Sequence, residues 1–275
     1  MKKYLYALLL APSIASAYQA EVTPVFAKVD SDSNIKGTSY GVSLNAYLNP
    51  VELKNHPYNE ADFLERASSI QIAAFETELT FPSGTELDGP NYSISTIIMS
   101  KNNNFYLDAN YSSTDLTSNN GASNNIDSNG FLISPGLFIQ KNTLVAIVYE
   151  KTDREVNGNS SENTLYGLAI KTVLPKVNIQ ASLTNDTYDE PGLEQTNREL
   201  GVLADYFINN KISVGARLDI NSGDDKNSEG KTLGVSANTY INKQFGVEIL
   251  YQQFNADNSS GDDSDTIALA ANFRF

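Results

Sequence analysis

The chain has 275 residues, of which 40% are apolar and 19% charged, and its 33 acidic side chains outnumber the 19 basic ones to give a net charge of −14. This sign excludes nucleic-acid binding, because a phosphate backbone requires a basic surface. The lack of cysteine removes disulfides, thiol catalysis and thiolate metal sites. A mean hydropathy of −0.31 argues against a helical membrane protein. It is compatible with a membrane β-barrel, whose strands have one apolar and one polar face.

Residues 1–17 predict a secretory signal peptide. Lys2 and Lys3 supply a basic start, residues 4–10 an apolar core and residues 15–17 (Ala-Ser-Ala) a small-residue cleavage site. An uncleaved anchor is the weaker alternative, because the apolar stretch is too short to span a bilayer. We therefore expect residues 18–275 to form the folded protein.

From residue 18 onward, apolar and polar residues alternate with the period of a β-strand. In the clearest case, residues 212–220, one parity is wholly apolar and the other is polar or small. About fourteen such segments occur, each of about 10–13 residues, which is long enough to cross a bilayer at a strong tilt. They are 18–30, 38–48, 68–80, 91–100, 104–114, 130–140, 143–152, 163–173, 176–186, 197–207, 211–221, 231–241, 244–254 and 265–275.

The connections between these segments alternate between short and long. Short ones are expected at 101–103, 141–142, 175, 209–210 and 242–243, and long polar ones at 115–129, 153–162, 187–196, 222–230 and 255–264. Short periplasmic turns and long external loops are typical of outer-membrane barrels. The sequence thus predicts an all-β protein: a closed antiparallel transmembrane β-barrel of about 14 strands, with 12 or 16 as alternatives, in a bacterial outer membrane.

Aromatic residues support this prediction. On the apolar parity they gather near both ends of the segments, as expected of the two aromatic girdles at the membrane interfaces. They are Tyr40, Tyr92, Tyr111, Phe131, Tyr166 and Tyr251 near the long loops, and Phe105, Tyr206, Phe245 and Phe273 near the short turns. The last segment ends on Phe275 and resembles the final-strand signal that the barrel-assembly machinery of Gram-negative bacteria reads. That machinery is therefore an expected partner.

Residues 49–67 depart from the alternation where a short periplasmic turn is due. Residues 57–67 read Pro-Tyr-Asn-Glu-Ala-Asp-Phe-Leu-Glu-Arg-Ala, and after Tyr47-Leu48-Asn49-Pro50-Val51 they resemble a motif of the putative general bacterial porin family, Pro-x-x-Glu-Ala-x-Phe-Leu-x-Arg-Ala after the second strand. Asp62 stands where a small residue is expected in relatives. The resemblance implies an outer-membrane diffusion channel.

The same stretch is the candidate constriction. Its second half has helical spacing, and Asn59 is a candidate N-cap. Because its apolar side chains gain by leaving water, we expect a short helix or folded turn at or in the periplasmic opening. The residues expected to narrow the path are Glu60, Asp62, Phe63, Leu64, Glu65 and Arg66. The alternative is a periplasmic flap without effect on flow.

Catalysis and cofactors are not expected. The only histidine, His56, lies in this non-strand stretch, so Ser–His or Asp–His chemistry at the external rim lacks its general base. Neither a metal site nor a cofactor is predicted. Acidic clusters at Asp224-Asp225 and Asp262-Asp263-Asp265 offer oxygen ligands for Ca²⁺, but solvated loop charge is the simpler interpretation.

The polar parity supplies the expected pore lining: Asp108, Lys171, Glu199, Asp205, Arg217, Asp219, Glu248 and Arg274. The function predicted is a porin for passive diffusion of small polar solutes and ions, weakly preferring cations. A non-conducting structural or adhesive barrel that acts through its loops is the alternative. Outer-membrane lipid and lipopolysaccharide are expected partners, no nucleic acid is, and the oligomeric state and the permeating solute stay open.

Overall fold

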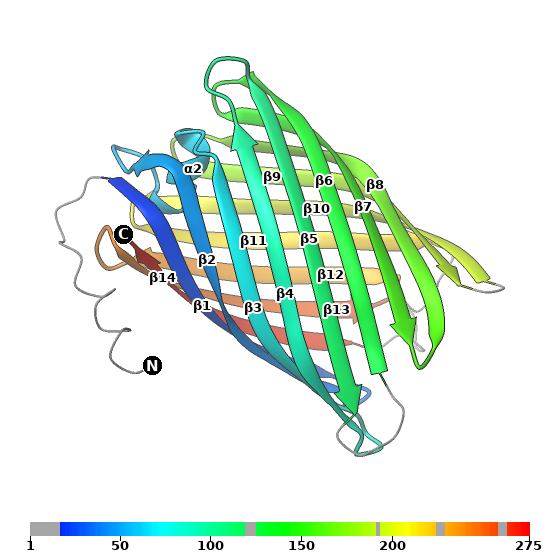
Figure 1. The fold of residues 1–275 in the computed structure, drawn as a ribbon. Helices are drawn as coiled ribbons and strands as arrows, with labels where there is room; N and C mark the ends of the chain where they lie inside the picture. The colour runs from blue at the N-terminus through cyan, green and yellow to red at the C-terminus, as the bar shows by residue number, and fades with distance from the viewer. Residues whose placement is uncertain (1–16, 119–124, 191–192, 224–228, 258–262) are drawn as a thin grey trace.

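The computed structural model describes residues 17–118, 125–190, 193–223, 229–257 and 263–275. Fourteen antiparallel strands form a closed barrel in which each strand pairs with its neighbours in sequence and β1 pairs with β14 (Figure 1). The predicted barrel class and strand number are confirmed. No helix in the described residues has the length and hydropathy needed to cross a membrane. The predicted signal peptide lies, except for Ala17, outside the described residues.

The strands are 11 to 17 residues long. Their bounds are β1 Ala17–Ser31, β2 Lys36–Glu52, β3 Ser69–Thr80, β4 Glu86–Met99, β5 Phe105–Ser118, β6 Asn125–Gln140, β7 Thr143–Val156, β8 Asn159–Val173, β9 Val177–Glu190, β10 Leu193–Asn209, β11 Ile212–Gly223, β12 Gly230–Tyr240, β13 Phe245–Ala256 and β14 Ser264–Arg274. Two short helices, η1 (Tyr58–Glu60) and α2 (Ala61–Leu64), lie between β2 and β3.

The alternation of the sequence becomes a difference between the two faces of the wall. On β10, for example, Leu200, Val202 and Tyr206 point outward and are exposed, whereas Leu203 and Asp205 point inward. An outward surface of large apolar side chains is the face that a barrel presents to lipid.

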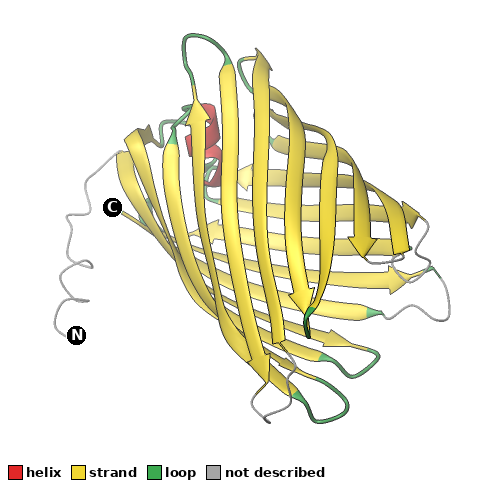
Figure 2. Ribbon diagram, turned by 45° about the vertical axis from the view of Figure 1, so that its right-hand side comes forward, coloured by secondary structure: helices red, strands yellow, loops and turns green. Residues whose placement is uncertain are grey.

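The two ends of the barrel differ. Both described chain termini and the five short turns, residues 100–104, 141–142, 174–176, 210–211 and 241–244, lie at one end. The helix pair also lies at this end, within the ring of strands (Figure 2). Because bacterial barrels place short turns and both termini in the periplasm, this end is the periplasmic one.

At the opposite end, two expected long loops are not loops. The predicted connection 153–162 is mostly strand, with a turn of only Asn157 and Gly158 between β7 and β8. The predicted connection 187–196 is strand up to Glu190 and again from Leu193. The pairing continues from Asp153↔Glu162 to Val156↔Asn159. Alternation fails as a signal here because water bathes both faces of a strand beyond the membrane, so that both faces become polar.

The stretch between β2 and β3 also differs from its expected bounds. β2 continues through Glu52, and its Val51 pairs with Tyr18 of β1 beyond a register shift between Tyr18 and Ala20. The irregular part is therefore residues 53–68, which we call the lumen segment. The expected Asn59 cap is wrong: Pro57 precedes η1 without a capping hydrogen bond. The Asn59 amide instead donates to Ser213 Oγ on the barrel wall at 3.4 Å.

Candidate functional site

The lumen segment packs against inward-facing side chains on all sides of the barrel. Tyr58 and Ala61 belong to a buried apolar cluster with Tyr18, Tyr47 and Tyr240, from β1, β2 and β12. Phe63 belongs to a second cluster built by β4, β6, β7, β8 and β10, whose members are Met99, Phe138, Leu144, Val173 and Phe207, with Leu64 packed against it. The segment thus bridges the interior instead of following one wall.

Glu60 is the most buried charged residue of the segment. Its carboxylate forms an ion pair with Lys171 Nζ at 2.7 Å and accepts a hydrogen bond from Asn178 Nδ2 at 2.9 Å. Asn178, which is fully buried, also donates to Asp205 at 3.0 Å. The Lys171 ammonium lies 4.6 Å from the centroid of the Phe63 ring. Burial raises the pKa of the Glu60 carboxyl, and the adjacent Lys171 ammonium opposes that rise.

Two arginines join the segment to the barrel wall. Arg66 donates to the carbonyl oxygens of Ser100 and Lys141 and to Asn104 Oδ1, and its guanidinium lies 4.0 Å from the Phe138 ring centroid. Arg274 on β14 donates to the Tyr58 carbonyl at 3.0 Å. Its guanidinium pairs with Glu21 and lies against the rings of Tyr18 and Tyr240. Hydrogen bonds and contacts with aromatic rings, not a single exposed ion pair, therefore make up the contacts of both arginines.

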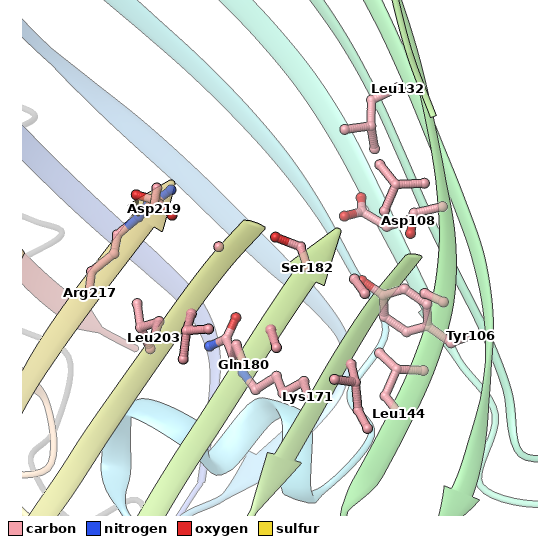
Figure 3. A pocket seen from close by; sticks show the side chains of 18 residues that line it. Tyr106, Asp108, Leu132, Leu144, Lys171, Gln180, Ser182, Leu203, Arg217 and Asp219 are labelled. Carbon is pink, nitrogen blue, oxygen red and sulfur yellow. Dashed lines mark hydrogen bonds and ion pairs between the residues drawn. The ribbon is translucent and has the colours of Figure 1, made fainter. Parts of the chain in front are cut away.

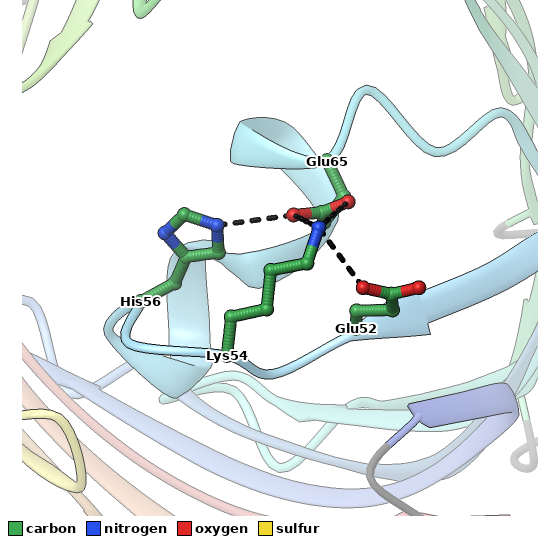
Figure 4. A network of polar contacts seen from close by, with 4 residues as sticks. All are labelled: Glu52, Lys54, His56 and Glu65. Carbon is green, nitrogen blue, oxygen red and sulfur yellow. Dashed lines mark hydrogen bonds and ion pairs between the residues drawn. The ribbon is translucent and has the colours of Figure 1, made fainter.

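Glu65 organises the periplasmic side of the segment (Figure 4). It accepts from Lys54 Nζ at 3.0 Å and from His56 Nε2 at 3.0 Å, and Lys54 also pairs with Glu52 at 2.9 Å. Partial burial raises the pKa of the Glu65 carboxyl, but the hydrogen bonds and charges of Lys54 and His56 outweigh it and hold that pKa below its usual range. His56 therefore has a role inside the segment, as a partner of Glu65.

A cavity lies on each side of the lumen segment. Asn59 and Glu60 line one of about 280 Å³, which faces the barrel interior and includes Asp205 and Glu248. Leu64, Glu65 and Arg66 line another of about 610 Å³ at the periplasmic face. Asp62 lies in sequence between the residues that line the two cavities. Its side chain is half-buried, and its backbone carbonyl accepts a hydrogen bond from the Ala67 amide. The segment therefore lies between the barrel interior and the periplasmic face.

All eight expected pore-lining residues occupy inward positions, and the structure brings most of them together. Asp108 and Tyr106 face Lys171, Arg217 and Asp219 across a cavity of about 330 Å³ (Figure 3). Asp205 and Glu248 line the adjoining cavity, which shares Arg217. Glu199 and Arg274 line neither of these cavities. Glu199 points inward on β10, and Arg274 is buried beneath the segment.

The basic and acidic members differ in their pairing. Lys171 pairs with Glu60, Arg217 with Asp219 and Arg274 with Glu21. In the described part of the chain, the other four acids have no basic side chain within ion-pairing distance; they are Asp108, Glu199, Asp205 and Glu248. The excess charge of this wall is therefore negative.

Some residues of this site were not predicted from the sequence. Glu21 and Asn178 lie on the polar parity of their strands, but parity alone does not indicate which of many inward residues meet. The inward aromatic residues were also missed, although they carried a signal. Phe138, Phe207 and Tyr240 are apolar residues on a polar parity, each close to a short turn. Together they mark the place where an apolar segment docks.

The acidic clusters considered for Ca²⁺ fall mostly outside the described residues, which exclude Asp224, Asp225 and Asp262. Asp263 accepts a hydrogen bond from the Ala256 amide at 2.8 Å. Within the described ranges, no group of three or more candidate ligands is arranged to hold a metal ion.

Comparisons with known proteins agree with this geometry. Residues 4–192 match the family model described as putative general bacterial porin. Among solved structures, the outer membrane protein Omp33 of Acinetobacter baumannii is 20% identical, with 94% of this chain and 99% of that chain covered and a TM-score of 0.58. A FadL homologue of Pseudomonas aeruginosa is 8% identical, with coverage of 94% and 90% and a TM-score of 0.54. The P. putida toluene transporter TodX is 10% identical, with coverage of 98% and 92% and a TM-score of 0.50. A search of curated proteins found no match.

Proposed function

Because the chain belongs to the putative general bacterial porin family, we propose that it forms a water-filled channel for passive diffusion of small polar solutes and ions. The protein is an outer-membrane barrel of channel type. No catalytic role is part of the proposal, since the single histidine is engaged with Glu65 in the lumen segment.

The observation that carries the proposal is the polar, incompletely filled interior. Charged side chains on β5, β8, β10, β11 and β13 face cavities of about 330 and 280 Å³. A fourteen-strand barrel with strands about 4.8 Å apart and tilted by about 40° is roughly 27 Å across between backbones, too wide for side chains to fill it completely.

The lumen segment is the proposed constriction. The contacts of Glu60, Phe63 and Arg66 with the wall hold this segment in the periplasmic half of the interior. The residues proposed to narrow the path are Glu60, Asp62, Phe63, Leu64, Glu65 and Arg66. Irregular backbone at membrane depth is tolerated where it is buried in protein or lines a water-filled cavity. The proposed path for solutes runs past this segment, from the cavity lined by Asn59 and Glu60 to the cavity lined by Leu64, Glu65 and Arg66.

A cation preference follows from the pairing. The three bases among the expected pore-lining residues are each paired with an acid, whereas Asp205 and Glu248 share one cavity without a basic partner of their own. External charge adds to this field but is screened over about 8–10 Å at physiological ionic strength. We therefore expect a weak cation preference that decreases as salt rises.

Liposome swelling with uncharged polar solutes of increasing size tests the proposal. Refolded protein, checked by heat-modifiable migration on a detergent gel, should admit the smallest solutes fastest and exclude large ones. Failure of correctly folded protein to admit even the smallest solute would overturn the proposal and favour a structural or adhesive barrel.

Reversal potentials in a KCl gradient test the ion preference. Asp205→Asn with Glu248→Gln should lower the cation preference, whereas Glu155→Gln, on the outward face beyond the membrane, serves as the control and should change it little. A preference for anions at low salt in the unmodified protein would contradict the assignment.

A further inference from the structure

The five short periplasmic turns share one composition. Each contains one lysine and no acidic residue, although acids outnumber bases 33 to 19 in the whole chain. All five lysines are exposed. We call this set the lysine rim: Lys101 in turn 100–104, Lys141 in 141–142, Lys176 in 174–176, Lys211 in 210–211 and Lys243 in 241–244.

The rim is opposite in charge to the other end of the barrel. There the extended strands β6 to β9 carry acidic side chains on their outward faces, at Asp127, Asp153, Glu155, Glu162 and Asp189. Lys151 pairs with two of them, Asp153 and Glu162. Charge is therefore polarised along the barrel axis, with the positive pole at the periplasmic end.

The outward apolar surface next to the lysine rim indicates the depth of the rim relative to the membrane. Each lysine follows, by two or three residues, an outward aliphatic side chain that is between 41% and 64% exposed: Ile98, Ile139, Leu174, Ile208 and Ile241. Such side chains face the lipid acyl chains. A lysine placed one step beyond them extends its stem along the apolar surface and its ammonium to the level of the lipid headgroups.

The rim ammonium groups make few contacts with the described part of the chain. Among the described residues, none of the five lies within ion-pairing distance of an acid. Within the described ranges, Lys211 alone of the five has a protein acceptor, the Ile241 carbonyl at 3.4 Å. Because an ammonium group has three donors, Lys211 still has two with which to bind a further acceptor.

We propose that the lysine rim binds the phosphate groups of anionic phospholipids in the periplasmic leaflet of the outer membrane. A lysine near an anionic bilayer surface is favoured by a factor of roughly five. The ring would fix the depth of the barrel in the membrane and concentrate anionic lipid around it. This binding is independent of whether the lumen conducts.

Spin-labelled lipids in bilayers of phosphatidylcholine provide the test, because their spectra report the relative association of phosphatidylglycerol and phosphatidylcholine with the protein surface. The rim variant carries Lys101→Gln, Lys141→Gln, Lys176→Gln and Lys243→Gln. The matched control removes the same charge from the opposite end with Lys28→Gln, Lys36→Gln, Lys151→Gln and Lys231→Gln. Heat-modifiable migration confirms that both variants fold.

At low ionic strength we expect the unmodified protein to prefer phosphatidylglycerol over phosphatidylcholine by about fivefold. Addition of 0.5 M salt should weaken this preference. The rim variant should lose most of this preference and the control should retain it. Equal loss in both variants, or retention in the rim variant, would overturn the proposal. Loss of binding to isolated peptidoglycan with the lipid preference unchanged would also overturn it and assign the rim to the cell wall.

Discussion

The Glu60–Lys171 pair predicts an asymmetric response to removal of its two members. The Glu60 side chain is 6% exposed and the Lys171 side chain 25%, with Lys171 at the wall of the 330 Å³ cavity. Lys171→Met leaves a carboxylate buried without a cation, at a cost of about 3 kcal/mol or more. Glu60→Gln leaves an ammonium that water can reach beside the Phe63 ring, and we expect a cost of about 1 kcal/mol.

Hydrogen–deuterium exchange of the lumen segment measures these costs. The amides of Tyr58, Glu65 and Arg66 donate to Asn210, Ala61 and Phe63 and exchange only when the segment undocks. At tenfold per 1.4 kcal/mol, Lys171→Met should accelerate their exchange roughly 100-fold and Glu60→Gln roughly fivefold. The double variant should exchange more slowly than Lys171→Met alone, because no buried charge is left unpaired.

A surface pair provides the control for this experiment. Lys151 and Glu162 pair at 2.8 Å on the outward face, with both side chains largely exposed. Lys151→Met should therefore leave exchange of the segment unchanged, since exposed pairs contribute about 0–1 kcal/mol and this pair lies at the other end of the barrel. Acceleration by Glu60→Gln that equals or exceeds that of Lys171→Met would refute the reasoning from burial.

Three further predictions concern the segment and the last strand. Phe63→Ala removes a ring buried against Phe138 and should cost about 3–5 kcal/mol of docking energy, seen as larger current fluctuations in single channels that Phe63→Leu does not produce. Because the pKa of the Glu65 carboxyl is lowered, its contribution to docking is present above the ordinary glutamate pKa and is lost as pH falls through the lowered one. Protection of the His56 amide from exchange should therefore hold from pH 7 down to the ordinary glutamate pKa of about 4.3 and decrease only below it. In Glu65→Gln this protection should be low at every pH. Deleting Phe275, whose backbone pairs with Gln19 and Ala20, should lower the level of assembled barrel in cells without changing the conductance of channels that do assemble.

The fold was predictable because a barrel wall has two different solvents along most of its length. Residues 212–220 alternate without exception, so their strand and its facing follow from the sequence. The sequence no longer predicts the strands beyond the membrane, where water contacts both faces of the wall. Around Asp153 and Glu162, beyond the membrane, the strands are polar on both faces. The sequence pattern therefore predicts loops there, although the strand pairing continues.

The site was predictable in part for the same reason. Inward charges such as Asp108 and Arg217 follow from parity, whereas the partners Glu21 and Asn178 depend on how the ring closes and where residues 53–68 dock. The docking surface itself was visible as inward apolar residues, Phe138 and Phe207 among them, next to short turns. Apolar residues on the polar parity of a barrel are therefore worth examining as the contact surface of an internal segment.

Single-channel conductance in a planar bilayer, with and without the lumen segment, tests the central claim most directly. Replacing residues 55–66 with a four-residue turn removes Phe63, Glu60 and Arg66 and their contacts with the wall while keeping all fourteen strands. If the protein is a channel narrowed by this segment, the shortened protein conducts more than the unmodified one and excludes only larger solutes. An unchanged conductance in shortened protein that migrates as a folded barrel would contradict the account.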